Sequence, residues 1–215
     1  MYKYLREPLN GLTHIIGAGL SLIGLIALII KAIITNSSLM TIVSVILFGV
    51  SMILLYSASA TYHSVISTEK VIYTLKKLDH SMIFVLITGS YAPFCLIALN
   101  NKVGFILFGA VLISAILGII FKMFWVTCPK WVSSVMYIAI GWFAIFAIYP
   151  LSQVLIPKAL FLLVLGGIMY TIGGIIYAFK DNKFQIGQFG THEIFHIFII
   201  LGTVCHFLAV FLYVI

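Results

Sequence analysis

Long apolar runs alternate with short polar breaks along the whole chain. A helix that crosses a membrane needs about 20 predominantly apolar residues. Seven runs come close to that length, at residues 12–34, 40–62, 80–99, 103–124, 132–149, 158–179 and 192–214. The breaks between them are too short to hold a second domain. The pattern therefore predicts an all-α integral membrane protein, a seven-transmembrane helix bundle in which residues 1–215 form a single domain.

Proline and glycine inside the runs add detail to these helices. Pro93 lies within the third run and is expected to kink its helix, because proline removes a backbone hydrogen bond. Gly166 and Gly167 lie two helical turns before Gly173 and Gly174. Small residues repeated on one face let helices approach closely. These glycines therefore predict a helix–helix contact rather than a ligand-binding loop.

Composition excludes a soluble protein. The 215 residues are 63% hydrophobic and 8% charged, whereas soluble domains have about 25% charged residues. The net charge of +7 fits loops that face anionic lipid, and no nucleic-acid-binding module is recognisable. The three cysteines, Cys95, Cys128 and Cys205, are scattered and odd in number, so they predict neither a disulfide framework nor a zinc ribbon.

The basic residues are divided unequally between the two ends of the predicted bundle. With seven spans, the N-terminus and every second connection lie on one side of the membrane. That side holds Lys3, Arg6, Lys70, Lys76, Lys77, Lys122, Lys130, Lys180 and Lys183, and the other holds Lys31, Lys102 and Lys158. Because cytoplasmic loops carry an excess of Lys and Arg, the nine-to-three division predicts a cytoplasmic N-terminus and a C-terminus outside.

Unusual polar residues from three runs are expected at the inner end of the bundle. His63 ends the second run, Asp79 precedes the third, and His192 and His196 open the seventh. His192 and His196 are four residues apart on one helix face, so both can bind one metal ion. With His63 they predict a three-histidine zinc site that keeps a fourth position open for water. Ionisable groups are costly to bury in a membrane segment, which favours a functional role.

Two further residues form a candidate catalytic group with this site. Asp79 is the carboxylate expected to hold the zinc-bound water and accept its proton. Ser59 lies one turn before His63 on the same helix face and could orient a ligand or stabilise developing negative charge. Structural roles remain open for each residue taken alone. A histidine can face headgroups, Asp79 can cap a helix, and Ser59 can hydrogen-bond its own backbone.

The other histidines have weaker assignments. His14 follows Glu7 by seven residues on a similar helix face, which suggests that these two side chains pair. His80 points about 100° away from the preceding aspartate around a helix. His206 lies about 15 Å beyond the last predicted metal ligand along the helix. It is too distant to share the metal and is expected to hydrogen-bond within the bundle.

A competing motif overlaps the metal ligands. The stretch from His192 to His196 matches H-E-x-x-H, the zinc-protease helix in which the glutamate is the base. No later residue of this run offers a third ligand at the same depth. Glu193 can instead cap the helix N-terminus, where its charge suits the helix dipole. A protease stays open as an alternative, and it differs in making Glu193 rather than Asp79 essential.

Five motifs occur in order along the chain. They are Glu7-Pro8-Leu9-Asn10 to Thr13-His14, Ser59-Ala60-Thr61-Tyr62-His63, Leu78-Asp79-His80-Ser81, Gly89-Ser90-Tyr91-Ala92-Pro93-Phe94, and His192-Glu193-Ile194-Phe195-His196 to His206-Phe207. This set resembles the bacterial hemolysin III family, which belongs with the progestin and adiponectin receptors and, more distantly, the alkaline ceramidases. The resemblance implies a multi-pass protein of the bacterial cell membrane. It also implies zinc near the cytoplasmic face, held by His63, His192 and His196, with Asp79 at the zinc-bound water and Ser59 beside it.

The function that the resemblance implies is broader than its fold. Eukaryotic relatives are associated with ceramide hydrolysis, and bacterial members are named for hemolytic activity and linked to membrane lipid homeostasis. The leading hypothesis is a zinc-dependent hydrolase that cleaves a lipid amide or ester within the membrane. Membrane lipid is then the partner, and no nucleic acid or soluble protein is expected. The alternatives are a pore-forming cytolytic protein and a non-enzymatic, zinc-containing membrane sensor.

Overall fold

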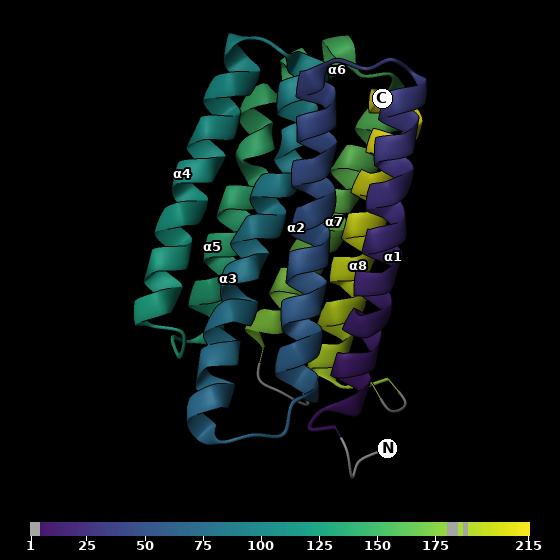
Figure 1. Ribbon diagram of the computed structural model, residues 1–215. Coiled ribbons are helices and arrows are strands. Elements are labelled where there is room, and N and C mark those ends of the chain that lie inside the picture. Colours follow the sequence, from purple (N-terminus) through teal and green to yellow (C-terminus); the bar gives the residue numbers. More distant parts are fainter. Residues whose placement is uncertain (1–4, 180–184, 187–188) are drawn as a thin grey trace.

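The computed structural model describes residues 5–179, 185–186 and 189–215. In this part of the chain, seven helical segments are long and apolar enough to cross a membrane, as the hydrophobic pattern predicts. They run alternately up and down in one bundle (Figure 1). The elements are α1 (Pro8–Ile34), α2 (Leu39–Ser64), α3 (Glu69–Pro93), η1 (Phe94–Leu99), α4 (Lys102–Phe124), α5 (Lys130–Gly141), η2 (Trp142–Ala147), α6 (Ile148–Val154), α7 (Pro157–Ala178), α8 (Thr191–Ala209) and η3 (Val210–Val214).

Local sequence explains where several helices begin and end. Pro8 and Pro157 occupy first-turn positions of α1 and α7, where proline costs no hydrogen bond. Asn101 caps α4 by accepting a hydrogen bond from the Gly104 N–H at 3.1 Å. Asn100, just before it, has a left-handed backbone with φ of 41°, which asparagine tolerates better than most residues. These signals define short connections, which place successive helices next to one another.

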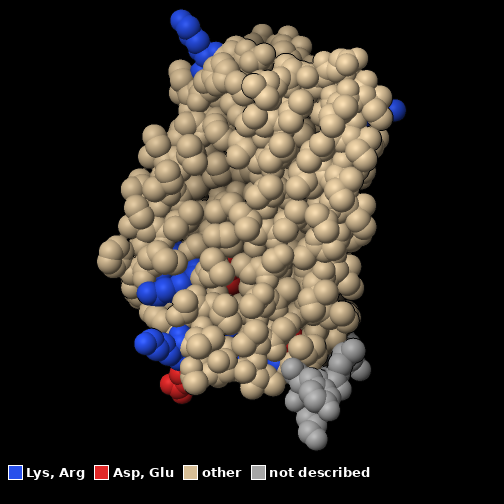
Figure 2. All heavy atoms as spheres, viewed as in Figure 1, with Lys and Arg blue, Asp and Glu red and all other residues tan. Residues whose placement is uncertain are grey.

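Neighbouring helices pack against one another around the whole bundle. α1 packs against α2 and α8, α2 against α3, α3 against α4, and α7 against both α8 and α5. The first and last spans are therefore neighbours although they lie at opposite ends of the sequence (Figure 1). In the view of Figure 2, charged side chains lie mainly toward the ends, and most of the height is uncharged. Such an apolar band suits a surface that faces lipid.

The third helix begins earlier than its apolar run. The run predicts a helix from residue 80, but α3 starts at Glu69. Its first turns carry Lys70, Lys76 and Lys77, so they are too polar for a hydrophobicity pattern to find. Asp79 therefore lies ten residues inside a helix, and the interpretation of Asp79 as a helix cap is wrong.

The fifth span is longer and less regular than predicted. Pro150 was expected to begin a break, but the span continues to Val154. The α-helical pattern stops at Gly141, tightens into a 3₁₀ segment, and restarts as α6 at Ile148. Pro150 thus falls in the first turn of a new helix, where a missing N–H is tolerated.

Pro93 and the paired glycines behave broadly as predicted. The regular α-helical pattern of α3 gives way at Pro93 to a π-helical segment, η1. A Cβ atom on Gly166 would lie 2.3 Å from the His206 ring, and one on Gly173 would lie 3.1 Å from Phe198, so both face α8. Gly174 instead faces Ile138 of α5. The predicted break at residues 180–183, with Lys180 and Lys183, lies outside the described residues, as does Lys3.

Candidate metal centre

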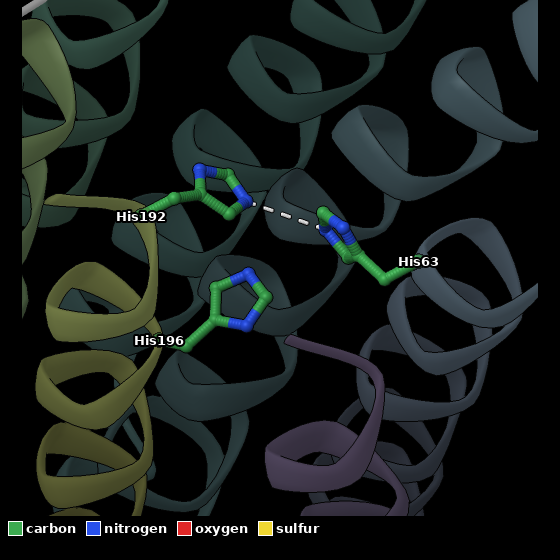
Figure 3. Close-up of side chains that lie close together, drawn as sticks. All are labelled: His63, His192 and His196. Carbon is green, nitrogen blue, oxygen red and sulfur yellow. Dashed lines mark hydrogen bonds between the residues drawn. The ribbon is translucent and has the colours of Figure 1, made fainter. Parts of the chain in front are cut away.

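The three histidines predicted as metal ligands meet at the end of the bundle where α1 begins and α2 ends (Figure 1). His63 is in the last turn of α2, whereas His192 and His196 occupy the first two turns of α8. Figure 3 shows the ring of His63 facing the two rings from α8. His63 and His196 are buried, with 2% and 1% of their surface exposed, so neither simply faces lipid headgroups.

The separations between the rings fit a single metal ion. One ligand nitrogen from each histidine lies within 4.8 Å of the others. The Nε2 atoms of His63 and His192 are 3.3 Å apart. Zinc binds imidazole nitrogen at about 2.0–2.1 Å with tetrahedral geometry, which puts neighbouring nitrogens roughly 3.3–3.4 Å apart. The His63–His192 separation matches that spacing, and the 4.8 Å limit on all three nitrogens places them close enough for one metal ion to draw them together.

Hydrogen bonds on the far side of the rings determine which nitrogens are free. The Nδ1 atom of His63 lies 2.6 Å from Oε2 of Glu7. The Nδ1 atom of His196 lies 3.4 Å from Oγ1 of Thr13, whose own hydroxyl donates to the Asn10 carbonyl at 2.9 Å. Since the acceptors are used on the Nδ1 side, both rings carry their proton there. Their Nε2 lone pairs remain available for a metal ion.

The expected pairing of Glu7 with His14 is wrong. Neither ring nitrogen of His14 has a hydrogen-bond partner, and Glu7 contacts His63 instead. The His14 ring lies flat on the His196 ring, with centroids 3.7 Å apart and planes 10° apart. Similar helix faces did not produce contact because the two side chains are two turns apart, about 10 Å along the axis.

Glu7 remains ionised beside the histidines. Partial burial raises its pKa, but the hydrogen bond and charge of His63 and the charge of Arg6 outweigh burial and lower the pKa to about 2. The Arg6 guanidinium approaches Glu7 within 3.3 Å and lies over the Tyr62 ring at 4.3 Å. A carboxylate that is anionic at neutral pH therefore lies behind His63.

Asp79 and Ser59 line the same cavity as the histidines of α8. Both are buried, with 7% and 2% of their surface exposed, and their side chains lie within hydrogen-bonding reach of each other. Asp79 comes from α3 and Ser59 from α2, one turn before His63. All five residues predicted for the site are thus gathered at one end of the bundle.

The cavity extends from this end into the bundle. Its volume is about 100 Å³, and it is partly open to the outside. Its walls come chiefly from α3, α5, α7 and α8, and it reaches Tyr91 and His206 beyond the metal centre. Most of the lining is apolar, with residues such as Ile83, Ile87 and Ile199. His192 and His196 of the candidate metal centre therefore lie at the polar end of a mainly apolar cavity.

Two other sequence predictions can be checked at this site. Nε2 of His206 donates a hydrogen bond to the Leu163 carbonyl at 3.1 Å, because a carbonyl oxygen can only accept. This confirms the predicted bonding of His206 within the bundle. The Glu193 carboxylate accepts a hydrogen bond from the Gly190 N–H at 2.9 Å, so it caps α8. Tyr177, to which the sequence motifs gave no role, lines the cavity and contacts the His192 and Phe195 rings.

Fold and site together define a class: a multi-pass, all-α membrane protein with a three-histidine group that could hold a metal ion. Residues 2–207 match the family described as haemolysin-III related. The chain is 40% identical over 213 residues to the Hemolysin-3 homolog of Bacillus subtilis (strain 168), covering 99% of this chain and 96% of that protein. It is 39% identical over 215 residues to Hemolysin-3 of Bacillus cereus, covering 100% and 94%.

The chain therefore belongs to the hemolysin III family, and it is a multi-pass bacterial membrane protein. A shorter match connects it to a eukaryotic receptor-like protein. It is 40% identical over 48 residues to the ADIPOR-like receptor IZH1 of Eremothecium gossypii, which covers 20% of this chain and 15% of that protein. This match agrees with the grouping that the five motifs suggested.

Proposed function

We propose that this protein is a zinc-dependent hydrolase that cleaves an amide or ester bond of a membrane lipid. The observation that carries the proposal is the convergence of three imidazoles, the Asp79 carboxylate and the Ser59 hydroxyl at one end of a mainly apolar cavity. Zinc held by three histidines polarises a carbonyl and activates water at neutral pH. The three candidate ligands are all imidazoles, with no cysteine among them, and imidazole is a good ligand for zinc.

The residues of this chain would then share the remaining work. Asp79 holds the attacking water and takes its proton, which it later passes to the leaving amine or alcohol. Ser59 donates a hydrogen bond to the oxygen that gains negative charge as the carbonyl is attacked. His63, His192 and His196 would hold the metal ion, His63 and His196 through Nε2. The carbonyl carbon gains the hydroxyl group of the water as its bond to the leaving group breaks. The products are a fatty acid and an amine or alcohol that carries the other proton of the water.

The cavity supports a lipid as the substrate. Its apolar walls suit an acyl chain, while the scissile bond lies at the polar end. Trp142 lines the cavity with 40% of its surface exposed, and its Nε1 donates to Thr171 Oγ1 of α7 at 2.9 Å. Because this part of the cavity wall is exposed, we propose that an acyl chain enters sideways from the lipid at the edge between η2 and α7, once the bond between Trp142 and Thr171 opens.

A cytolytic pore is the second candidate, because two relatives are named Hemolysin-3. A monomeric channel needs several helices with polar faces, whereas the seven spans in the described part of the chain are mostly apolar. A protease is less well supported, because the carboxylate of Glu193 caps α8 and is therefore engaged away from the metal. A zinc-containing sensor stays compatible with the same three histidines, and lipid turnover separates it from a hydrolase.

The deciding experiment compares Asp79→Asn with Glu193→Gln in purified, zinc-loaded protein reconstituted in lipid vesicles. Release of fatty acid is measured over a panel of amide- and ester-linked lipids. We expect Asp79→Asn to lower turnover about 10²–10⁴-fold, as for loss of a general base, and Glu193→Gln to retain most of it. Loss in Glu193→Gln alone would favour the protease. No turnover in the wild type, with dye leakage unchanged by Asp79→Asn, would favour the pore.

A further inference from the structure

The motif at the start of α1 contacts the metal centre at every polar position. Glu7, Asn10, Thr13 and His14 all point toward the histidines of α2 and α8 or toward one another. We propose that this motif orients the metal ligands, with Glu7 as the positioning residue for His63 and Thr13 as the positioning residue for His196. The inference rests on metal binding by the three histidines, the first step of the proposed function.

Glu7 fixes the ring of His63 from behind. The 2.6 Å hydrogen bond to Nδ1 selects the form of the ring in which Nε2 carries the lone pair. A carboxylate in this position also makes the imidazole a stronger electron donor to a metal. Asn10 holds the same Glu7 oxygen through a 3.1 Å hydrogen bond from Nδ2. The carboxylate is thereby kept in place although 39% of its side chain is exposed.

Backbone contacts hold this segment against the end of α2. The Glu7 N–H donates to the His63 carbonyl at 2.9 Å, and the Arg6 N–H donates to the Ser64 carbonyl at 3.3 Å. The two helices are close enough here that a Cβ atom on Gly11 would lie 2.5 Å from the Ser64 hydroxyl. The carboxylate of Glu7 therefore reaches His63 from a backbone segment that is itself hydrogen-bonded to the end of α2.

Thr13 and His14 fix the orientation of the His196 ring. Thr13 Oγ1 donates to the Asn10 carbonyl, so its lone pair is left to accept from Nδ1 of His196 at 3.4 Å. The stacked ring of His14 confines His196 to one plane, with centroids 3.7 Å apart. Two of the three ligands are thus oriented by one helix that contributes no ligand of its own.

A purely structural role makes a different prediction. If the bond between Glu7 and His63 only fastens α1 to α2, its loss lowers the stability of the metal-free protein and leaves the metal site unchanged. If it orients the ligand, metal affinity and ligand geometry change as well. Loss of such an outer partner typically lowers metal affinity about 10–100-fold.

The test measures zinc affinity by competition with a chromophoric chelator, and the visible spectrum of the Co²⁺-loaded protein. We expect Glu7→Ala to weaken zinc binding about 10–100-fold and Thr13→Val about tenfold, each with altered cobalt bands. Glu7→Asp and Thr13→Ser restore part of the affinity. Glu69→Gln is the matched control, since it removes the same charge from the first turn of α3, away from the histidines, and keeps wild-type affinity.

Each outcome decides the inference. Wild-type affinity and cobalt spectra in folded Glu7→Ala and Thr13→Val overturn it, as does a wild-type protein that binds no metal. If Glu7→Ala does not fold, Glu7→Gln and Thr13→Val decide by the same two readings. Weakened binding in Glu7→Ala, in a protein that binds zinc but cleaves no lipid, supports this inference and contradicts only the hydrolase.

Discussion

At the scale of single residues, the chemistry depends on which nitrogen each histidine presents. The Nδ1–H groups of His63 and His196 donate to Glu7 and Thr13, which leaves Nε2 as the unprotonated nitrogen of both rings, and Nε2 of His192 lies 3.3 Å from that of His63. Without a metal ion these two nitrogens can share only one proton, in the hydrogen bond between His63 and His192. The arrangement therefore predicts that the purified protein retains a metal ion.

The corresponding prediction concerns metal content. Detergent-purified wild-type protein should carry about one zinc per chain, and the His192→Ala/His196→Ala variant should carry almost none, because two of three ligands are lost. His206→Gln serves as the control, since it alters the same cavity and leaves the three histidines intact. Elemental analysis measures both. A folded, chelator-free wild-type preparation without metal would shift the function toward a pore or a regulator.

Sequence reasoning found the site residues because they are rare polar groups in apolar runs. His63, Asp79, His192 and His196 interrupt segments in which little else is ionisable, and counting helices places them at one end. The same reasoning chose the wrong partner for Glu7. Glu7 contacts His63 rather than His14 because partner choice depends on how closely α1 approaches α2, which helix periodicity does not encode.

At the scale of helices, α7 and α8 pack most closely where glycine allows it. A Cβ atom on Gly166 would meet the His206 ring at 2.3 Å and the Gly202 carbonyl at 3.1 Å, whereas one on Gly167 meets nothing within 4 Å. The His206 ring cannot move aside cheaply, because it bonds the Leu163 carbonyl and packs between Phe94 and Tyr170. The neighbouring glycines therefore form a natural matched pair.

Alanine at these two positions should have opposite effects. Gly166→Ala overpacks the contact and should destabilise the protein by about 1–3 kcal/mol. Gly167→Ala should be neutral, or stabilising by up to about 1 kcal/mol, because alanine favours the helix. Thermal unfolding in detergent measures both. Equal midpoints for the two variants would mean that α7 and α8 do not approach in the way described.

Hydrophobic periodicity predicted the number of helices but not all of their limits. It locates a helix only where the helix is apolar, so it missed the first turns of α3, which carry three lysines. Hydrophobic periodicity also predicted that the fifth helix ends before Pro150, whereas Pro150 lies in the first turn of α6. A proline that follows the end of a helix and a proline in a first turn cannot be told apart from sequence alone. Tertiary packing, rather than local preference, decides such cases.

At the scale of the whole molecule, the division of basic residues predicts which end faces the cytoplasm. One of the nine basic residues assigned inside, Lys122, is fully buried, where its ammonium donates to Cys128 Sγ at 3.2 Å and to Ser133. It therefore does not meet headgroups. The remaining excess is still eight to three in the sequence, so the orientation continues to be predicted with the N-terminus and the metal centre on the cytoplasmic side.

Thiol labelling of intact cells checks this orientation. Thr35 and Ser67 are exposed residues in the first and second connections, at opposite ends of the bundle. In a Cys205→Ala background, which removes the native cysteine of intermediate exposure, a membrane-impermeant maleimide should label Thr35→Cys in intact cells. It should label Ser67→Cys only after lysis, and the background protein should stay unlabelled. The reverse pattern would place the metal centre outside, where a hydrolase would act on the outer leaflet and take its water and release its product on that side.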